Sequence, residues 1–154
     1  MQIRPATVDD IPLLSDIMVT SFRAAFSGFI SETTMSAQTD SDHCRGMMET
    51  IFRDSTMHFL LGDSSGMLIW QETQTGAEIM SLHVLPECRG TGLGHALMEA
   101  ALAQTGSSPV CLWTFRENHH ARRFYERHGF RPDGRERVSS FDDVIEVCYT
   151  LIPR

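Results

Sequence analysis

A short run of alternating glycines is the segment of this sequence best suited to chemistry. It extends from Arg89 to Gly94, reads RGTGLG, and lies between an apolar run that ends at Pro86 and an amphipathic stretch that follows. Glycines have no Cβ, so N–H groups along such a run can turn toward one point without steric interference. A helix that starts there adds about half a positive charge at its N-terminus. The segment therefore predicts a cradle for a diphosphate, with Arg89 supplying a full positive charge at its rim.

Two well-known phosphate-binding loops do not match this segment. A Walker A loop ends in Gly-Lys-Ser/Thr, whereas Gly94 is followed by His95 and Ala96. A dinucleotide-binding fingerprint has the spacing GxGxxG, whereas the three glycines here alternate strictly. A glycine-rich turn without a ligand is the remaining alternative. The position of the run, directly after an arginine and between a strand and a helix, argues against that alternative.

A second patterned segment follows about one βαβ unit later. Residues 118–130 show the pattern Asn-x-x-Ala-x-x-Phe-Tyr-x-x-x-Gly-Phe. Together the two segments resemble the GCN5-related N-acetyltransferase (GNAT) superfamily, whose pyrophosphate pattern is Arg/Gln-x-x-Gly-x-Gly/Ala. The resemblance is strong over residues 57–131, weak over 1–10 and limited to strand pattern over 132–154. Residues 22–53, which in this family often shape the acceptor pocket, match nothing diagnostic.

The resemblance implies a single GNAT domain over residues 1–154 with a mixed α+β fold. In that fold a central, twisted, mostly antiparallel sheet of six to seven strands is flanked by about four helices. It also implies an enzyme that moves an acetyl group from acetyl-CoA to a primary amine of a small molecule or protein, by direct transfer in a ternary complex. The alternative is a catalytically silent module that binds or senses acyl-CoA. The presence of both Tyr125 and an intact loop at 89–94 favours the enzyme.

By resemblance, several groups of residues hold the cofactor. The backbone of the strand end pairs with the pantetheine arm, and an N–H near Val84 polarises the thioester carbonyl. Asn118 lies near the pantetheine or simply caps its helix. Arg122, with Arg123 beside it, adds charge near the ribose phosphate or lies in solvent. The Leu93 side chain is expected to fill the core rather than to touch the ligand. The full cofactor-binding set is Leu82, His83, Val84, Arg89, Gly90, Thr91, Gly92, Leu93, Gly94, Asn118 and Arg122.

The resemblance also suggests residues for proton transfer. Tyr125 aligns with the tyrosine that protonates the departing CoA thiolate, and its alternative role is packing on the sheet. An acceptor ammonium with a pKa of about 10 must lose a proton before it attacks. Glu78, near the start of the strand before Pro86, is the favoured base, acting through a water, and His83 at the strand end is the other candidate. Strand alternation places Glu78 and His83 on opposite faces unless a bulge intervenes.

The elements that must position these residues follow from apolar periodicity and turn signals. Thr7 and Asp10 form a capping-box-like start for the first helix. Residues 31–41 indicate a loop or a broken helix, and Pro132-Asp133-Gly134 predicts a turn. The short turns between 57 and 85 predict an antiparallel meander. Strands are expected at 2–4, 57–61, 67–71, 77–85, 110–115, from 130 and at 144–151, and helices after Thr7, at 43–52, at 93–104 and after Asn118.

Composition narrows the class of protein. Apolar residues make up 42% and charged residues 21%, as in ordinary globular proteins. The net charge of −7 disfavours nucleic acid and anionic lipid as partners and mildly favours a basic acceptor such as an amine. The first residues lack the apolar stretch of a signal peptide, and no run is long enough to span a membrane.

The spacing of the cysteines indicates a reducing compartment, and the spacing of the histidines indicates that no metal site is present. The four cysteines are widely spaced and form no CxxC pair, so they are expected to be reduced thiols in a cytoplasmic protein. None of the seven histidines has a neighbour at a convincing metal-ligand spacing, so no metal site is expected. A monomer or a homodimer is expected.

Overall fold

A twisted sheet forms the centre of the molecule. The structure is a computed structural model and describes residues 1–152, within which the sheet has seven strands in the order β1-β2-β3-β4-β5-β7-β6. All neighbouring strands pair in antiparallel fashion except β4 and β5, which are parallel. The mostly antiparallel sheet of a mixed α+β fold is therefore confirmed. The strands are β1 (Ile3–Pro5), β2 (Met57–Gly62), β3 (Gly66–Thr73), β4 (Gly76–Val84), β5 (Val110–Phe115), β6 (Arg131–Val138) and β7 (Ile145–Leu151).

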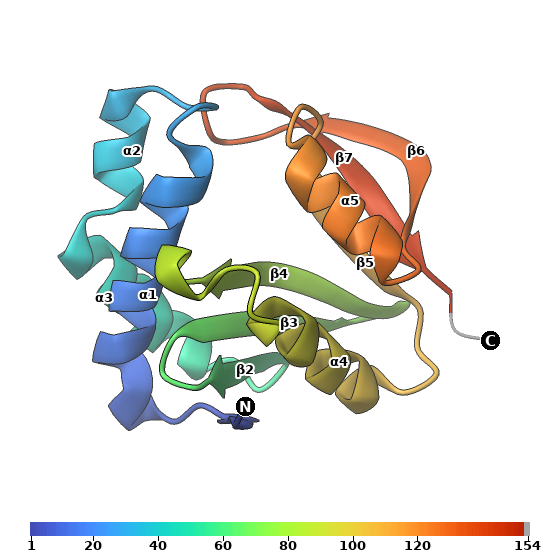
Figure 1. Cartoon of the computed structure of the whole chain (residues 1–154), viewed down its shortest axis with the longest axis horizontal. Coiled ribbons are helices and arrows are strands. Elements are labelled where there is room, and N and C mark those ends of the chain that lie inside the picture. Colours follow the sequence, from blue (N-terminus) through green and yellow to red (C-terminus); the bar gives the residue numbers. More distant parts are fainter. Residues whose placement is uncertain (153–154) are drawn as a thin grey trace.

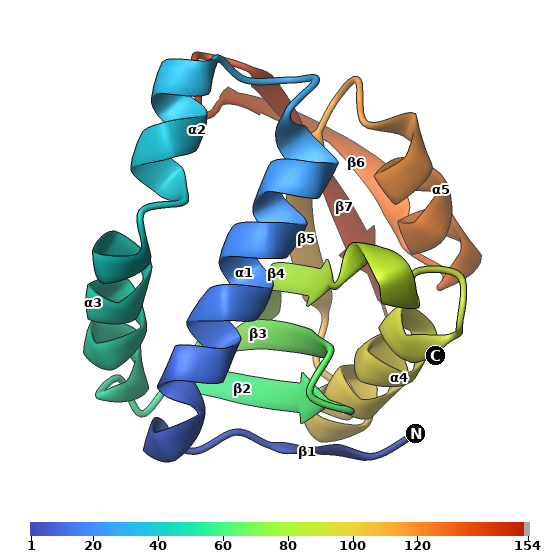
Figure 2. The ribbon, with the colours of Figure 1, turned by 60° about the vertical axis from the view of Figure 1, so that its left-hand side comes forward.

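Helices cover both faces of this sheet. Over residues 1–152 they are α1 (Ile11–Phe26), α2 (Glu32–Gln38), α3 (Ser41–Phe52), α4 (Leu93–Thr105) and α5 (His119–Arg127), with 3₁₀ turns η1 (Val8–Asp10) and η2 (Pro86–Cys88). Figure 1 shows α1, α2 and α3 at one side of the molecule and α4 and α5 at the other. Figure 2 shows α1 running across β2, β3 and β4, with α3 beside it. None of the helices described here is long and apolar enough to cross a membrane.

Two of the three apolar clusters among residues 1–152 lie on opposite faces of the sheet, and β3 contributes to both. Its Met67 and Ile69 pack with α1 and α3, whereas Leu68 and Trp70 pack with α4. All four are buried, because successive side chains of a strand point to opposite faces and both faces are covered here. Residues paired across β3 and β4 point to the same face, so the alternation in β3 also gives the face of each residue in β4.

The parallel pair β4–β5 separates along its length. Its ladder joins Ala77–Ile79 to Val110–Leu112 and ends there. Beyond that point β4 continues beside β3, and β5 continues beside β7, so the two strands diverge (Figure 1). The β4 segment from Met80 to Val84 therefore has β3 as its partner on one edge and a gap on the other.

A β-bulge lies in β4 at the point where the strands separate. Trp70 of β3 pairs with Ile79, but the preceding residue, Ile69, pairs with Ser81, so Met80 is the extra residue. A bulge inserts one residue and shifts the alternation of the strand by one position. Ile79 and Leu82 consequently face the same core, the one formed with α4.

The first helix begins as its sequence predicts. The backbone N–H of Thr7 donates to the Asp10 carboxylate at 2.7 Å, and Arg4 donates two bonds of 2.8 and 2.9 Å to the same group. The predicted capping box is confirmed. The first turn is 3₁₀, and α1 itself starts at Ile11.

Residues 31–41 form a broken helix rather than a loop. Ser31 caps α2 by accepting the Thr34 N–H at 3.2 Å, and Asp40 caps α3 by accepting the His43 N–H at 2.8 Å. Two short helices with separate caps therefore replace one long one.

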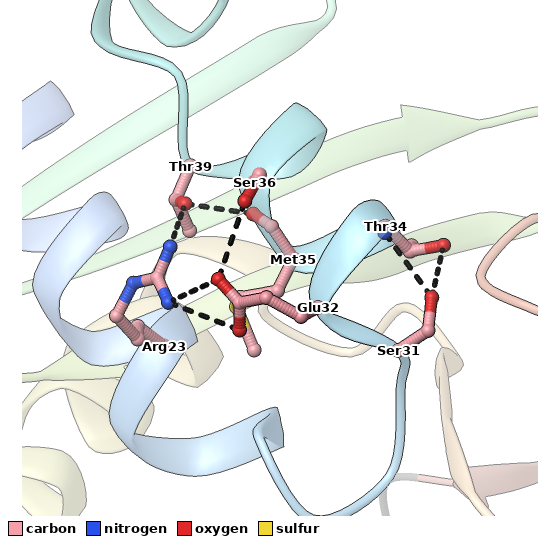
Figure 3. A network of polar contacts seen from close by, with 7 residues as sticks. All are labelled: Arg23, Ser31, Glu32, Thr34, Met35, Ser36 and Thr39. Carbon is pink, nitrogen blue, oxygen red and sulfur yellow. Dashed lines mark hydrogen bonds and ion pairs between the residues drawn. The ribbon is translucent and has the colours of Figure 1, made fainter.

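Arg23 ties α2 back to α1 (Figure 3). Its guanidinium donates to Glu32 at 3.1 Å and to Thr39 at 3.0 Å, at the two ends of α2. Ser36 donates to the same Glu32 carboxylate at 3.2 Å. The network fixes α2 against the end of α1, beside Phe115 at the end of β5.

The predicted turn at Pro132-Asp133-Gly134 is wrong. These residues lie within β6, an edge strand, where the pairing with β7 shifts between Pro132 and Glu136. The Asp133 carboxylate accepts the Arg135 N–H at 3.0 Å, and Gly134 has a φ of +92°. The turn-forming residues thus build a local irregularity in an exposed strand instead of ending it.

Candidate active site

The glycine run forms a sharp bend between η2 and α4. Gly90 and Gly92 have φ angles of +74° and +91°, a region that glycine enters without steric cost. The Thr91 hydroxyl donates to the carbonyl of Cys88 at 2.6 Å and fixes the bend. Leu93 then starts α4, and its side chain, 2% exposed, lies in the core as expected.

The backbone amides of this bend are unpaired. The first bond of the helix runs from Ala96 N–H to the Gly92 carbonyl at 2.9 Å, and none of the six amides from Gly90 to His95 has an acceptor within residues 1–152. Arg89 is exposed beside them and forms no ion pair with the described part of the chain. Unpaired amides at a helix N-terminus, together with a flanking cation, form an anion-binding site.

His83 lies beneath α1. Only 7% of its surface is exposed, and its Nδ1 lies 3.3 Å from the hydroxyl of Ser21, with the Phe22 ring beside it. Burial, with a smaller contribution from Arg89, lowers the pKa of His83 to about 4. The ring is therefore neutral at physiological pH.

Glu78 lines an open cavity of about 370 Å³ at the start of the gap between β4 and β5. Burial raises the pKa of its carboxyl group, and the nearby cation Arg137 opposes this effect. The other walls come from Met80, Trp113, Arg137, Phe141 and Glu146. Arg137 donates to Glu146 at 3.0 Å and stacks 4.2 Å above the Trp113 ring, so one carboxylate of the cavity is paired internally.

Tyr125 projects from α5 into the core shared by the sheet and α4. It is half-buried and packs near the rings of Phe124, Phe130 and Tyr149. Its hydroxyl makes no hydrogen bond within residues 1–152, and burial raises its pKa to about 12. The side chain therefore combines a packed ring with a phenol that stays protonated and has no acceptor among residues 1–152.

A family comparison identifies this architecture. The profile described as "Acetyltransferase (GNAT) domain" matches residues 54–132, which are 79 of the 154 residues. The chain belongs to the GNAT acetyltransferase family. The match covers the meander, the glycine bend and α5.

Individual relatives agree with this family. A curated protein from Archaeoglobus fulgidus, described as an uncharacterized N-acetyltransferase, is 36% identical over 89 residues, which are 56% of this chain and 60% of the relative. The match thus spans less than two thirds of that relative. The structure of PaiA N-acetyltransferase from Thermoplasma acidophilum, solved with coenzyme A, is similar with a TM-score of 0.76 at 18% identity, over 98% of both chains. A GCN5-related N-acetyltransferase from Rhodopseudomonas palustris gives a TM-score of 0.78 at 18% identity, over 98% of this chain and 94% of that one. At these identities the two structures show that the GNAT fold is shared.

Asn118 and Arg122 are both engaged within this GNAT domain. Asn118 caps α5 by accepting the Ala121 N–H at 3.2 Å. Arg122 donates to the Tyr149 hydroxyl at 2.9 Å and to the Arg116 carbonyl at 2.8 Å. These bonds link α5 to β7. They use Nε and Nη1 of Arg122, so Nη2, which has no acceptor among residues 1–152, can reach a phosphate without breaking either bond.

Sequence reasoning missed two groups of residues. Trp113, Arg137 and Glu146 line the cavity from β5, β6 and β7, and no local pattern reveals that these strands adjoin. His95 and Glu99 share a face of α4, and His128, which directly follows α5, lies close to both. Their spacing of four residues on one predicted helix was the available signal.

Proposed function

We propose that this GNAT domain transfers the acetyl group of acetyl-CoA to a primary amine in a ternary complex. The observation that carries the proposal is the gap between β4 and β5, which begins beside a carboxylate-lined cavity and leads toward the unpaired amides at the start of α4. The unpaired amides from Gly90 to Gly94, with the Arg89 side chain beside them, would hold the pyrophosphate. The pantetheine arm would then run along the free edge of Leu82–Val84, replacing the missing strand partner. Backbone N–H groups of β4 that point into the gap are suitable donors for the thioester carbonyl.

Glu78 is our choice for the base that removes a proton from the acceptor ammonium. It lines the cavity from which an acceptor would approach, and its raised pKa brings it closer to neutral pH, where a general base is most effective. His83 is a poorer candidate because a group with a pKa of about 4 binds a proton weakly at neutral pH. We assign His83 to positioning β4 against α1.

Tyr125 would support departure of the thiolate. A phenol with a pKa of about 12 stays protonated in the resting protein and can donate a hydrogen bond to the sulfur. A thiol has a pKa of about 8.5, so the thiolate is the weaker base, and hydrogen bonding should contribute more than complete proton transfer. In the overall reaction the ammonium first gives one proton to Glu78, the amine forms its bond to the acetyl carbon, and the C–S bond breaks. The nitrogen then loses a second proton. One of these two protons passes through Glu78 to solvent, and the other ends on the CoA thiol.

The cavity favours a small cationic acceptor. Its volume of about 370 Å³ lies at the lower end of the range for small-molecule sites. Glu146 is paired with Arg137, but Glu78 forms no ion pair in the described part of the chain, so an ammonium group would be its natural partner. The acidic net charge of −7 acts in the same direction at long range.

A panel of amines tests this function. Free thiol released from acetyl-CoA is measured with polyamines, amino acids, amino sugars and lysine peptides, and N-acetylated product is identified by mass spectrometry. We expect at least one small amine to raise thiol release well above the rate without an amine. If acetyl-CoA binds but no amine accelerates release, the domain is instead the silent acyl-CoA-binding module.

A further inference from the structure

Three side chains with metal-ligating atoms meet at the surface between α4 and α5. They are His95 and Glu99 of α4 and His128, which directly follows α5, and their ligand atoms all lie within 4.8 Å of one another. Within residues 1–152 this is the only group of three that meets this distance. The two histidines are 33 residues apart, so their approach is a product of the fold alone.

The ring of His128 is held in the tautomer that a metal ligand needs. Its Nδ1 lies 2.9 Å from the backbone carbonyl of Phe124, which can only accept a hydrogen bond. Nδ1 therefore carries the hydrogen, and in the neutral ring Nε2 has a free lone pair. Histidines that bind metals characteristically donate their other N–H to a carbonyl in this way. The Phe124 ring, 4.5 Å away, packs beside the imidazole and limits its rotation.

The lone pair of His128 points at the other ligands. Its Nε2 lies 2.8 Å from Nδ1 of His95. Glu99 follows His95 by four residues on α4, so both side chains project from the same face of that helix. One held imidazole, that of His128, thus meets an exposed imidazole and an exposed carboxylate from α4.

The spacing needs little adjustment to admit a cation. Zn–N bonds of about 2.0–2.1 Å at a tetrahedral angle place two ring nitrogens about 3.3 Å apart. The two nitrogens lie 2.8 Å apart as a hydrogen-bonded pair, so the rings would separate by about 0.5 Å. His95 and Glu99 are exposed and can supply this movement by small rotations of their side chains.

We propose that His95, Glu99 and His128 form a binding site for a first-row divalent cation such as Zn²⁺. Two imidazoles and one carboxylate are a ligand set that zinc proteins use, with water in the remaining position. Mg²⁺ and Ca²⁺ prefer oxygen ligands and fit this set poorly. The bound ion would cross-link the N-terminal part of α4 to the end of α5. Because His95 directly follows Gly94, this cross-link would also restrict motion of the bend proposed to hold the pyrophosphate.

Zinc binding to the full chain tests this site without any cofactor. Metal-free protein is titrated with Zn²⁺ by calorimetry in a non-chelating buffer with reductant, and melting temperatures are measured in parallel. We expect one equivalent to bind and to raise the melting temperature, because an ion that binds only the folded state stabilises it. Mg²⁺ should do neither. Acetyl-CoA is absent, so the result is independent of the proposed acetyl transfer.

Single substitutions assign the binding to these residues. His95→Ala and His128→Ala should each weaken zinc binding at least about 10-fold, since even the loss of outer contacts costs that much in metal sites. His120→Ala is the matched control, because His120 is an exposed histidine of α5 outside the cluster. If His128→Ala does not fold, His95→Ala decides, because His95 is exposed and its loss leaves no buried gap. Unchanged zinc affinity in His95→Ala, or no saturable binding in the wild type, would overturn the proposal.

Discussion

Glu78 and His83 lie on the same face of β4, the face that α1 covers. Glu78 pairs across the sheet with Gln71, and His83 pairs with Met67, a residue of the core beneath α1. The extra residue at Met80 makes this possible, since it shifts the alternation between them. One face of a single strand therefore carries a carboxylate at the mouth of the cavity and a buried imidazole farther along. Glu78 lines the cavity, whereas His83 is buried under α1, and this difference in environment is why we assign the base to Glu78 and a positioning role to His83.

Separate replacement of Glu78 and His83 should show which residue is the general base and which only positions β4. Glu78→Gln should lower turnover about 10²-fold or more, because a general base contributes at least that much. It should also remove the decline in rate at low pH, which in the wild type reflects protonation of this carboxylate. His83→Gln should keep that decline. Rates across pH 5 to 9 with acetyl-CoA affinity measured alongside check this, and a preserved low-pH decline in Glu78→Gln would exclude Glu78 as the base.

The same Glu78→Gln variant should be more stable than the wild type at alkaline pH. Burial raises the pKa of Glu78, so the folded chain holds this proton more tightly than the unfolded chain. The unfolded state then binds fewer protons, and stability falls as pH rises through the raised pKa. Glutamine has no proton to lose. Urea unfolding at pH 4 and pH 8 should show a gain for the variant at pH 8 relative to pH 4, and an equal effect at both values would contradict the assigned burial.

Acid should destabilise the protein through His83. Burial lowers its pKa to about 4, below the value of about 6.5 in an unfolded chain, so the unfolded state binds more protons between these limits. Stability is therefore complete above pH 6.5 and is lost as pH falls toward 4. The difference corresponds to about 3 kcal/mol once the ring is fully protonated. His83→Gln should lose correspondingly less stability from pH 7 to pH 4 in urea unfolding, and parallel curves for the two proteins would show that His83 is more accessible to water than its contacts indicate.

Tyr125→Phe removes the hydroxyl group and keeps the aromatic ring, so it separates the role of the hydrogen-bond donor from that of packing. The ring contacts with Phe130 and Tyr149 remain, so folding and acetyl-CoA affinity should change little. The chemical step should slow by about 10²-fold or more, because the donor to the leaving sulfur is lost. Single-turnover rates isolate that step from product release. An unchanged single-turnover rate would leave Tyr125 with a packing role only.

Much of this fold was predictable because its signals are local. The glycine bend, the Asn118 cap and the meander from Met57 to Val84 each depend on residues close together in sequence. Apart from α2 and the end of β6, the observed strands and helices accordingly begin and end within a few residues of their predicted positions. Residues 31–41 were harder, since their polar side chains suit both a loop and two capped short helices.

The cavity could not be predicted, because it depends on strand order. The insertion of β7 between β5 and β6 brings Glu146 and Arg137 beside Trp113, and the sequence carries no local sign of that order. The turn predicted at Pro132-Asp133-Gly134 was wrong because these residues lie in β6, and strand order places β6 at the edge of the sheet. An exposed edge strand tolerates an irregularity that a central strand would not. The meeting of His95 with His128 likewise follows from the fold, which places the Phe124 ring of α5 beside Gly94 of α4.

The cradle of amides at the start of α4 is tested most directly by the affinity of two thioesters. Acetyl-CoA carries the diphosphate and the 3'-phosphoadenosine, and S-acetylpantetheine lacks both, so the Gly92→Val variant assigns the difference to the bend. Calorimetry should show that the wild type binds acetyl-CoA at least about 100-fold more tightly, because several charge-assisted hydrogen bonds depend on the diphosphate. Gly92→Val should remove this preference, since a branched side chain at a φ of +91° distorts the bend. Gly106→Val is the matched control, at a φ of +60° and at the opposite end of α4, and should retain the preference. Equal affinities of the wild type for the two thioesters, or an undiminished preference in a folded Gly92→Val variant, would contradict the placement of the cofactor.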